Sequence, residues 1–200
     1  SKLISSFDHQ KWMFELPASS FGLQCEHRHR QPFLQFHGKD NMCGIVGFLT
    51  SRSADIPETQ TLSAMRDILH HRGPDDSGEY IRPIDERGPF IFFGHRRLSI
   101  IDLSGGHQPM SSEDKTVWVI FNGEIYNFIE LKKDLEKRGH RFKTNSDTEV
   151  IVHAYEEFDE ECFQLFNGMF AIGIWDEKKK KLILARDRLW KKPLYYIWVN

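Results

Sequence analysis

The sequence predicts a domain of the α+β class, with helices and strands mixed along the chain. Short apolar runs of strand length alternate with polar turns, and several intervening segments carry helix-start signals followed by apolar residues at helical spacing. The 200 residues, 40% of them hydrophobic, can bury one sizeable core with a short appendage. We therefore expect a single globular domain.

The strands are predicted where short runs combine apolar character with β-branched or aromatic residues. These runs are residues 45–49, 91–93, 117–121, 169–175 and 182–185. The lysine run at 178–181 lies between the last two strands, which is typical of a solvated hairpin tip.

Three helices are predicted from their start signals and apolar faces. Pro57 opens the first helix, Asn127 with Glu130 can cap the second, and Ser146 with Glu149 forms a capping box before the third. Their apolar faces are Leu62, Met65 and Leu69; Phe128, Leu131 and Leu135; and Ile151, Ala154, Tyr155 and Phe158.

Composition excludes several classes of function. A formal net charge of -2 and the lack of a basic stripe argue against nucleic-acid or anionic-membrane binding. The 3 cysteines have no framework or metal-like spacing, which favours reduced thiols and a cytoplasmic location. No apolar run approaches the roughly 18 residues of a membrane span, and no secretory signal is visible. We expect small-molecule or protein partners.

Residues 1–42 are interpreted as an N-terminal extension that is disordered or non-native, because residues 1–41 show no sustained helical or strand period. Cys25, His27 and His29 within it suggest a metal site. Zinc sites need about four ligands in a paired spacing, and no second pair follows, so a flexible polar segment is favoured.

Cys43 carries the most distinctive chemistry. As the first residue of a mature chain, its thiol would lie a few bonds from an α-amine of pKa about 7.7–8.0. Such an amine can accept the thiol proton and return a proton to a leaving amine, which makes a histidine base redundant. Taken alone, however, a cysteine before an apolar strand is more often a buried structural thiol.

An ordered series of motifs runs from Met42 to about Tyr196. It comprises Met-Cys-Gly-Ile-Val-Gly (42–47), His-Arg-Gly-Pro-Asp (71–75), His-Arg-Arg-Leu-Ser-Ile-Ile-Asp (95–102), Gln-Pro (108–109), Asn-Gly-Glu-Ile-Tyr-Asn (122–127), Ser-Asp-Thr-Glu-Val (146–150), Gly-Met-Phe-Ala (168–171) and Ala-Arg-Asp-Arg (185–188). With these motifs, residues 43–200 resemble the glutaminase domain of asparagine synthetases, which are class II glutamine amidotransferases. The resemblance implies a four-layer αββα sandwich of the N-terminal-nucleophile hydrolase type.

The resemblance also implies the reaction. Cys43 would attack the side-chain amide of L-glutamine, releasing ammonia and forming a thioester that water converts to glutamate. The Asn122 side chain and the Gly123 N–H would hold the oxyanion. From the dipeptide alone, Asn-Gly is also a fair turn after the strand at 117–121.

Two groups of residues would hold the rest of glutamine. Arg97 would bind the α-carboxylate as a planar bidentate donor, helped by main-chain groups of Leu98, Ser99, Ile100 and Ile101. Glu124 and Asp147 would bind the α-ammonium, although an Asp at a helix start is also common for structural reasons.

The remaining reactive residues receive structural interpretations. His70, His71 and the turn at 72–75 are assigned a structural or loop-positioning role, Cys162 is expected to be a packed thiol, and Arg96 is unassigned.

The chain departs from the family pattern in three ways. Cys43 is preceded by 42 residues, so we expect activity only once Cys43 becomes N-terminal; Met42 resembles the natural initiator. Asn200 comes before any synthetase domain, to which ATP and Mg²⁺ would belong, while no metal or cofactor is expected for glutamine hydrolysis. Trp190 stands where the family usually has Gly, and a bulky residue at positive φ would cost about 1–2 kcal/mol.

The leading hypothesis is a glutaminase that supplies ammonia for ATP-dependent asparagine synthesis by a synthetase domain. The alternatives are a non-catalytic glutamine-binding module, because Cys43 is not N-terminal, and an ammonia donor for another acceptor. L-Glutamine and the synthetase domain are the expected partners, and neither nucleic acid nor membrane is expected. Both a monomer and a homodimer are compatible with the sequence.

Overall fold

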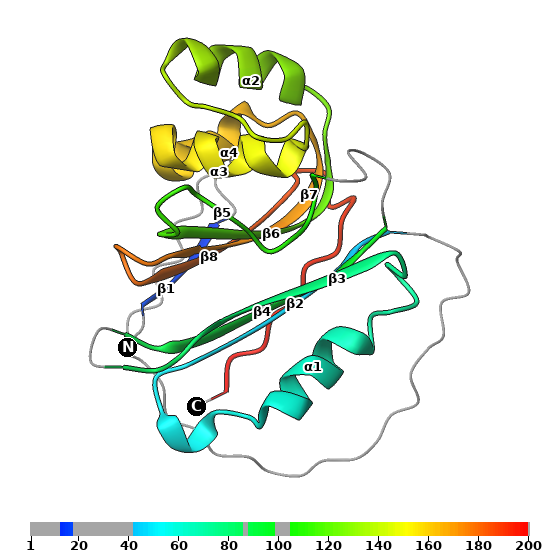
Figure 1. Ribbon diagram of the computed structural model, residues 1–200, viewed down its shortest axis with the longest axis vertical. Coiled ribbons are helices and arrows are strands. Elements are labelled where there is room, and N and C mark those ends of the chain that lie inside the picture. The colour runs from blue at the N-terminus through cyan, green and yellow to red at the C-terminus, as the bar shows by residue number, and fades with distance from the viewer. Residues whose placement is uncertain (1–12, 18–41, 86–87, 99–104, 200) are drawn as a thin grey trace.

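The computed structural model describes residues 13–17, 42–85, 88–98 and 105–199. Figure 1 shows two sheets stacked face to face, with α1 on the outside of one sheet and α3 and α4 on the outside of the other. This arrangement confirms the predicted αββα sandwich. No helix in the described segments is long and apolar enough to cross a membrane.

All strand pairs in the two sheets are antiparallel. The five-stranded sheet has the order β1-β8-β7-β6-β5 and the three-stranded sheet the order β2-β4-β3. Their bounds are β1 Met13–Pro17, β2 Gly44–Thr50, β3 Asp76–Arg82, β4 Phe90–Arg97, β5 Met110–Ser111, β6 Val117–Ile125, β7 Gly168–Asp176 and β8 Lys181–Arg186.

The helices form the outer layers. They are α1 Thr59–Asp67, α2 Phe128–Lys137, α3 Asp147–Phe158 and α4 Cys162–Leu165, with short 3₁₀ turns η1 Ser53–Asp55 and η2 Asp159–Glu161. Helix α3 packs on the five-stranded sheet, α2 packs on α3, and α1 covers β4. Cys162 is fully buried, as expected of a packed thiol.

The core is divided by the sheets because successive side chains of a strand point to opposite faces. On β4, Ile91 and Phe93 pack toward the other sheet, against Ile120 of β6 and Trp175 of β7. The alternate residues Phe90 and Phe92 join Leu62 of α1. Strands buried on both faces read as continuous apolar runs, which is how they were recognised in the sequence.

The structure corrects the end of the third predicted strand. Asn122 and Gly123 lie inside β6, paired with Ala171 and Phe170 of β7, and not in a turn. The backbone stays extended because β7 supplies a partner along the whole segment. Three strands were not predicted: β1, β3 and the short β5.

Of the two predicted side-chain caps, the one at Ser146 is confirmed and the one at Asn127 is wrong. Asn127 makes no capping hydrogen bond; its side chain instead accepts from Asn167 N at 2.9 Å. Ser146 does cap α3, accepting from Thr148 N at 3.2 Å. The Glu149 carboxylate does not complete the capping box, because it accepts from the backbone N–H groups of the preceding loop, including Lys143 N at 2.8 Å.

The hairpin between β7 and β8 has the predicted lysine-rich tip. Its lysines are paired with carboxylates: Lys178 with Asp114, Lys179 with Asp159, Lys180 with Glu177 and Lys181 with Glu160.

Part of the N-terminal extension forms a strand, contrary to the expectation. Residues 13–17 pair with β8, from Met13 opposite Ala185 to Pro17 opposite Lys181. Without β1, β8 would be a sheet edge with unpaired backbone groups, so a neighbouring segment gains hydrogen bonds by adding to it. Cys25, His27 and His29 lie outside the described residues.

Candidate active site

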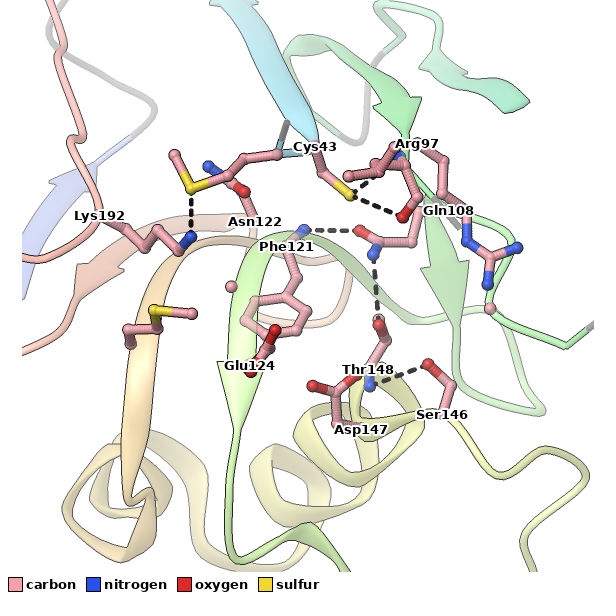
Figure 2. Close-up of a pocket in the computed structure, with 15 residues that line it drawn as sticks. Cys43, Arg97, Gln108, Phe121, Asn122, Glu124, Ser146, Asp147, Thr148 and Lys192 are labelled. Carbon is pink, nitrogen blue, oxygen red and sulfur yellow. Dashed lines mark hydrogen bonds between the residues drawn. The ribbon is translucent and has the colours of Figure 1, made fainter. Parts of the chain in front are cut away.

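A cavity of about 190 Å³ lies where the ends of the two sheets meet the start of α3. Most of the predicted site residues line it, from both halves of the sandwich (Figure 2). These residues are Cys43, Arg97, Leu98, Asn122, Gly123, Glu124 and Asp147. Ser99, Ile100 and Ile101 lie outside the described residues.

Cys43 directly precedes β2, and its thiol lies against Leu98. Leu98 N donates to the Cys43 sulfur at 3.4 Å, and the sulfur lies 3.7 Å from Leu98 O. Burial raises the pKa of the Cys43 thiol, and the Leu98 N–H and the positive charges of Arg97 and Lys192 only partly oppose that rise. The thiol therefore needs a base before it can act as a nucleophile.

The turn at 71–75 holds the residues around the thiol. Arg72 Nε donates to the carbonyl oxygen of Cys43 at 3.3 Å, and Asp75 N donates to Arg97 O at 3.0 Å. His71 is exposed, and its Nδ1 lies 3.1 Å from Ile68 O. These contacts support the positioning role expected for the turn.

Asn122 and Gly123 occupy fixed positions in β6. A Cβ on Gly123 would lie 2.0 Å from the carbonyl oxygen of Met169, so only glycine fits between β6 and β7 at this position. The Asn122 side chain is 5% exposed. Figure 2 shows Asn122 and Cys43 at the same end of the cavity.

Arg97, at the end of β4, is 6% exposed. Gly106 lies against its guanidinium, because a Cβ on Gly106 would come within 2.3 Å of Nη2 of Arg97. Gly106 is thus a site residue that the sequence analysis missed. The Gly-Gly pair at 105–106 was the only local signal, and a glycine pair alone is typical of any loop.

Gln108 joins two walls of the cavity (Figure 2). Its Oε1 accepts from Phe121 N at 2.7 Å, and its Nε2 donates to Thr148 Oγ1 at 3.2 Å. The amide therefore ties β6 to the first turn of α3. The sequence analysis noted the Gln-Pro motif but assigned it no role.

Asp147 and Glu124 place two carboxylates in the cavity. Burial raises the pKa of Asp147 to about 6; hydrogen bonds to the carboxylate, including one from Ile125 N, oppose the rise, and the charge of Glu124 adds to it. Ile125 N donates to Asp147 Oδ2 at 3.1 Å. Figure 2 shows this pair on a different side of the cavity from Arg97. The arrangement offers a cation to one end of a zwitterion and carboxylates to the other.

Lys192 also lines the cavity and is 4% exposed. Its ammonium contacts the sulfur of Met42. The loop that carries it is held by the Asp187 carboxylate, which accepts from Leu189 N at 3.1 Å and Lys192 N at 2.9 Å. Trp190, in the same loop, has the expected positive φ, at 59°. Sequence reasoning had no signal for the cavity position of Lys192.

The comparisons with known proteins decide the family. The sequence profile of the glutamine amidotransferase domain matches residues 42–200. This chain belongs to the glutamine amidotransferase family. The resemblance stated from the motifs is therefore confirmed.

Within the glutamine amidotransferases, the chain is similar to glutamine-hydrolyzing asparagine synthetases. It is 45% identical to asparagine synthetase 3 of Bacillus subtilis (strain 168) over 160 residues, which is 78% of this chain and 25% of that protein. It is 41% identical to the asparagine synthetase of Zea mays over 157 residues, again 78% of this chain and 25% of that protein. The chain thus spans about a quarter of the length of these relatives.

A solved structure of another glutamine amidotransferase has the same fold. The glutamine phosphoribosylpyrophosphate amidotransferase from B. subtilis superposes with a TM-score of 0.53 at 22% identity, covering 73% of this chain and 37% of that one.

Proposed function

We propose that this chain hydrolyses L-glutamine to glutamate and ammonia through a thioester on Cys43, once Cys43 is the first residue. One observation carries the proposal. A thiol, a guanidinium and two carboxylates line a single cavity, where the glutamine α-carboxylate can pair with Arg97 and its α-ammonium with Glu124 and Asp147. That pairing leaves the side-chain amide for Cys43.

The first half of the reaction transfers the acyl group to sulfur. The Cys43 sulfur bonds to the amide carbon while its proton passes to the α-amine of the same residue. The Asn122 amide and the Gly123 N–H donate to the oxyanion, which needs fixed donors where the charge develops. The C–N bond then breaks as the amine gives a proton to the departing ammonia.

The second half regenerates the enzyme. Water adds to the thioester and gives a proton to the α-amine, and the C–S bond breaks with release of glutamate. The amine returns a proton to the sulfur. No step requires a metal or a cofactor.

The length and names of the relatives support a further part of the proposal. The matched segment is 25% of the length of each relative, and both relatives are named as glutamine-hydrolyzing asparagine synthetases. We propose that residues 43–200 form the amidotransferase domain of such a protein, that its synthetase domain consumes the ammonia, and that ATP and Mg²⁺ bind to that domain.

The contact between Lys192 and Met42 favours a second candidate. With Met42 in place, the nitrogen of Cys43 is an amide and cannot act as a base. A chain that keeps Met42 would bind glutamine without hydrolysing it.

The test compares three proteins: the chain with residues 1–42, a chain that starts at Cys43, and that shorter chain with Cys43→Ala. Glutamate release is expected from the second protein alone, while glutamine raises the Tm of all three. Hydrolysis by the Cys43→Ala protein would exclude the thioester mechanism. Glutamine binding without hydrolysis by the chain that starts at Cys43 would identify the binding module.

A further inference from the structure

Two histidines and a glutamate converge between the end of α2 and the middle of α3, outside the cavity. The ligand atoms of His140, His153 and Glu156 all lie within 4.8 Å of one another. Nδ1 of His140 is 3.2 Å from Nδ1 of His153, and Oε2 of Glu156 is 2.9 Å from Nδ1 of His153 and 3.9 Å from Nδ1 of His140.

The backbone fixes all three positions. Helix α2 ends in a Schellman motif, in which Gly139, at φ 103°, donates to Glu136 O at 3.0 Å and His140 N donates to Leu135 O at 3.1 Å. His140 is thereby held directly after the helix. His153 and Glu156 lie three residues apart on α3, so their side chains share one face.

The neighbours of His140 orient its ring. Nε2 of His140 lies 3.3 Å from Oε2 of Glu157, whose other oxygen accepts from Arg138 at 3.1 Å. The carboxylate favours the proton on Nε2 and leaves the lone pair of Nδ1 directed at the cluster. Histidines that bind metals have this carboxylate partner on the far ring nitrogen.

His153 is 2% exposed, and its ring packs edge-on against Phe142 with centroids 4.6 Å apart. Its Nε2 makes no hydrogen bond among the described residues, although oxygens of Glu149 and Glu113 lie 3.8 and 4.0 Å away. Because two lone pairs repel at this distance, either one Nδ1 carries a hydrogen and donates it to the other, or a metal ion lies between the two nitrogens.

We propose that His140, His153 and Glu156 bind a divalent transition-metal ion, for which Zn²⁺ is the best fit. At Zn–N and Zn–O distances of about 2.0–2.2 Å, the ligand atoms of a tetrahedral site lie roughly 3.3–3.5 Å apart. The observed separations of 3.2, 2.9 and 3.9 Å bracket that value. Two imidazoles exclude Mg²⁺ and Ca²⁺ as preferred ions, since those take oxygen ligands.

A proton is the competitor of the metal ion. Burial lowers the pKa of His153, but contacts with Glu149 and Glu156 and the charge of Glu113 outweigh it and raise the pKa to about 9. A metal ion must displace this proton to bind His153. The second imidazole, that of His140, favours the metal ion because it adds another metal–nitrogen bond. The bound ion would join the end of α2 to α3, whose first turn lines the cavity.

The sequence analysis expected no metal site. His140 and His153 are separated by a loop and a helix turn, and no paired motif marks them. His140 reaches the face of α3 that carries His153 and Glu156 only because α2 packs against α3 in the folded chain.

The test uses the full chain with Cys43→Ala, which removes a competing zinc-binding thiol. Zn²⁺ titrated against a competing chelator should bind at a site whose affinity falls at least about 10-fold in His140→Ala and in Glu156→Gln. His70→Ala, which removes an exposed histidine away from the cluster, should leave the affinity unchanged. Long-range ¹H–¹⁵N spectra should show Zn²⁺ shifting Nδ1 of His140 and His153.

Three results would overturn the proposal: no Zn²⁺ binding by the Cys43→Ala chain, equal affinity in His140→Ala and His70→Ala, or zinc-dependent shifts confined to other histidines. Because His140 is partly exposed and Glu156→Gln preserves shape, both variants should fold, and their circular dichroism and Tm without metal check this.

Discussion

The backbone N–H of Leu98 points at the sulfur of Cys43, at 3.4 Å, and is the thiol's nearest hydrogen-bond donor among the described residues. A donor at this position stabilises the thiolate, while burial of the thiol has the larger, opposite effect. The thiol of the chain that retains residues 1–42 should consequently be unreactive at neutral pH.

Alkylation of Cys43 tests this balance. The rate of its modification by iodoacetamide, followed by peptide mass spectrometry, should still be rising with pH above the ordinary thiol range. Arg97→Met should move the midpoint higher because it removes a nearby positive charge. A midpoint below the ordinary thiol pKa, or one that Arg97→Met lowers, would contradict the assignment of burial as the main cause.

Gly123→Ala should destabilise the protein. The new Cβ would lie 2.0 Å from the Met169 carbonyl oxygen, so β6 and β7 must separate locally, at a cost of about 1–3 kcal/mol or more. Urea denaturation measures the loss. Gly47→Ala is the matched control, since its Cβ would come no closer than 3.3 Å to the Phe93 ring and 3.4 Å to the Phe92 carbonyl oxygen. Equal stability of the two variants would show that β6 and β7 are not held as described.

Asp147 should make the folded state less stable as pH rises. Its pKa in the folded protein is about 6, above the roughly 3.9 of an unfolded chain, so the folded state binds the proton more tightly. The stabilisation is complete below pH about 3.9 and is lost as pH rises through about 6. Asp147→Asn removes this dependence.

The free energy of unfolding of Asp147→Asn, relative to the parent, should therefore increase by about 2–3 kcal/mol between pH 4 and pH 7. Urea denaturation at several pH values gives this difference. A difference that stays constant, or decreases with pH, would mean that the carboxylate is not destabilised by burial. Glutamine should reduce the difference, because its ammonium pairs with the carboxylate.

Gly106→Ala should weaken glutamine binding without a comparable loss of stability. The added Cβ would lie 2.3 Å from Nη2 of Arg97, so the guanidinium must move. In the chain that starts at Cys43, KM for glutamine should therefore rise about 10-fold or more, with a smaller change in kcat. Arg97→Lys should have the same effect because the bidentate geometry is lost. If Gly106→Ala leaves KM unchanged, Arg97 does not bind the substrate carboxylate.

Local sequence patterns predicted an element correctly where the residues of that element alone determine its structure. The apolar runs predicted five strands, since side chains buried on both faces leave a continuous apolar signal. Strand β3 was missed because Asp76–Arg82 carries charged residues and a glycine, and its extended form depends on pairing with β4. The Asn127 cap was wrong for a related reason, as its partner Asn167 lies 40 residues away.

The site residues fall into the same two groups, those that local motifs predict and those that only the fold reveals. The motifs predicted the residues with charge or nucleophilic character, and the structure brings most of them to one cavity. Gly106 leaves space for the Arg97 guanidinium, Gln108 bridges β6 and α3, and Lys192 lies buried beside the cavity. None of these roles produces a local sequence pattern.

The site draws its parts from both sheets: Cys43 and Arg97 belong to the three-stranded half, and Asn122 and Asp147 to the other. The apolar layer around Ile91, Ile120 and Trp175 is what sets their separation. Neither half alone can hold both ends of an amino acid. Glutamine turnover therefore reports on the docking of the two sheets, and a swollen protein that keeps its secondary structure but loosens this layer would lose activity completely.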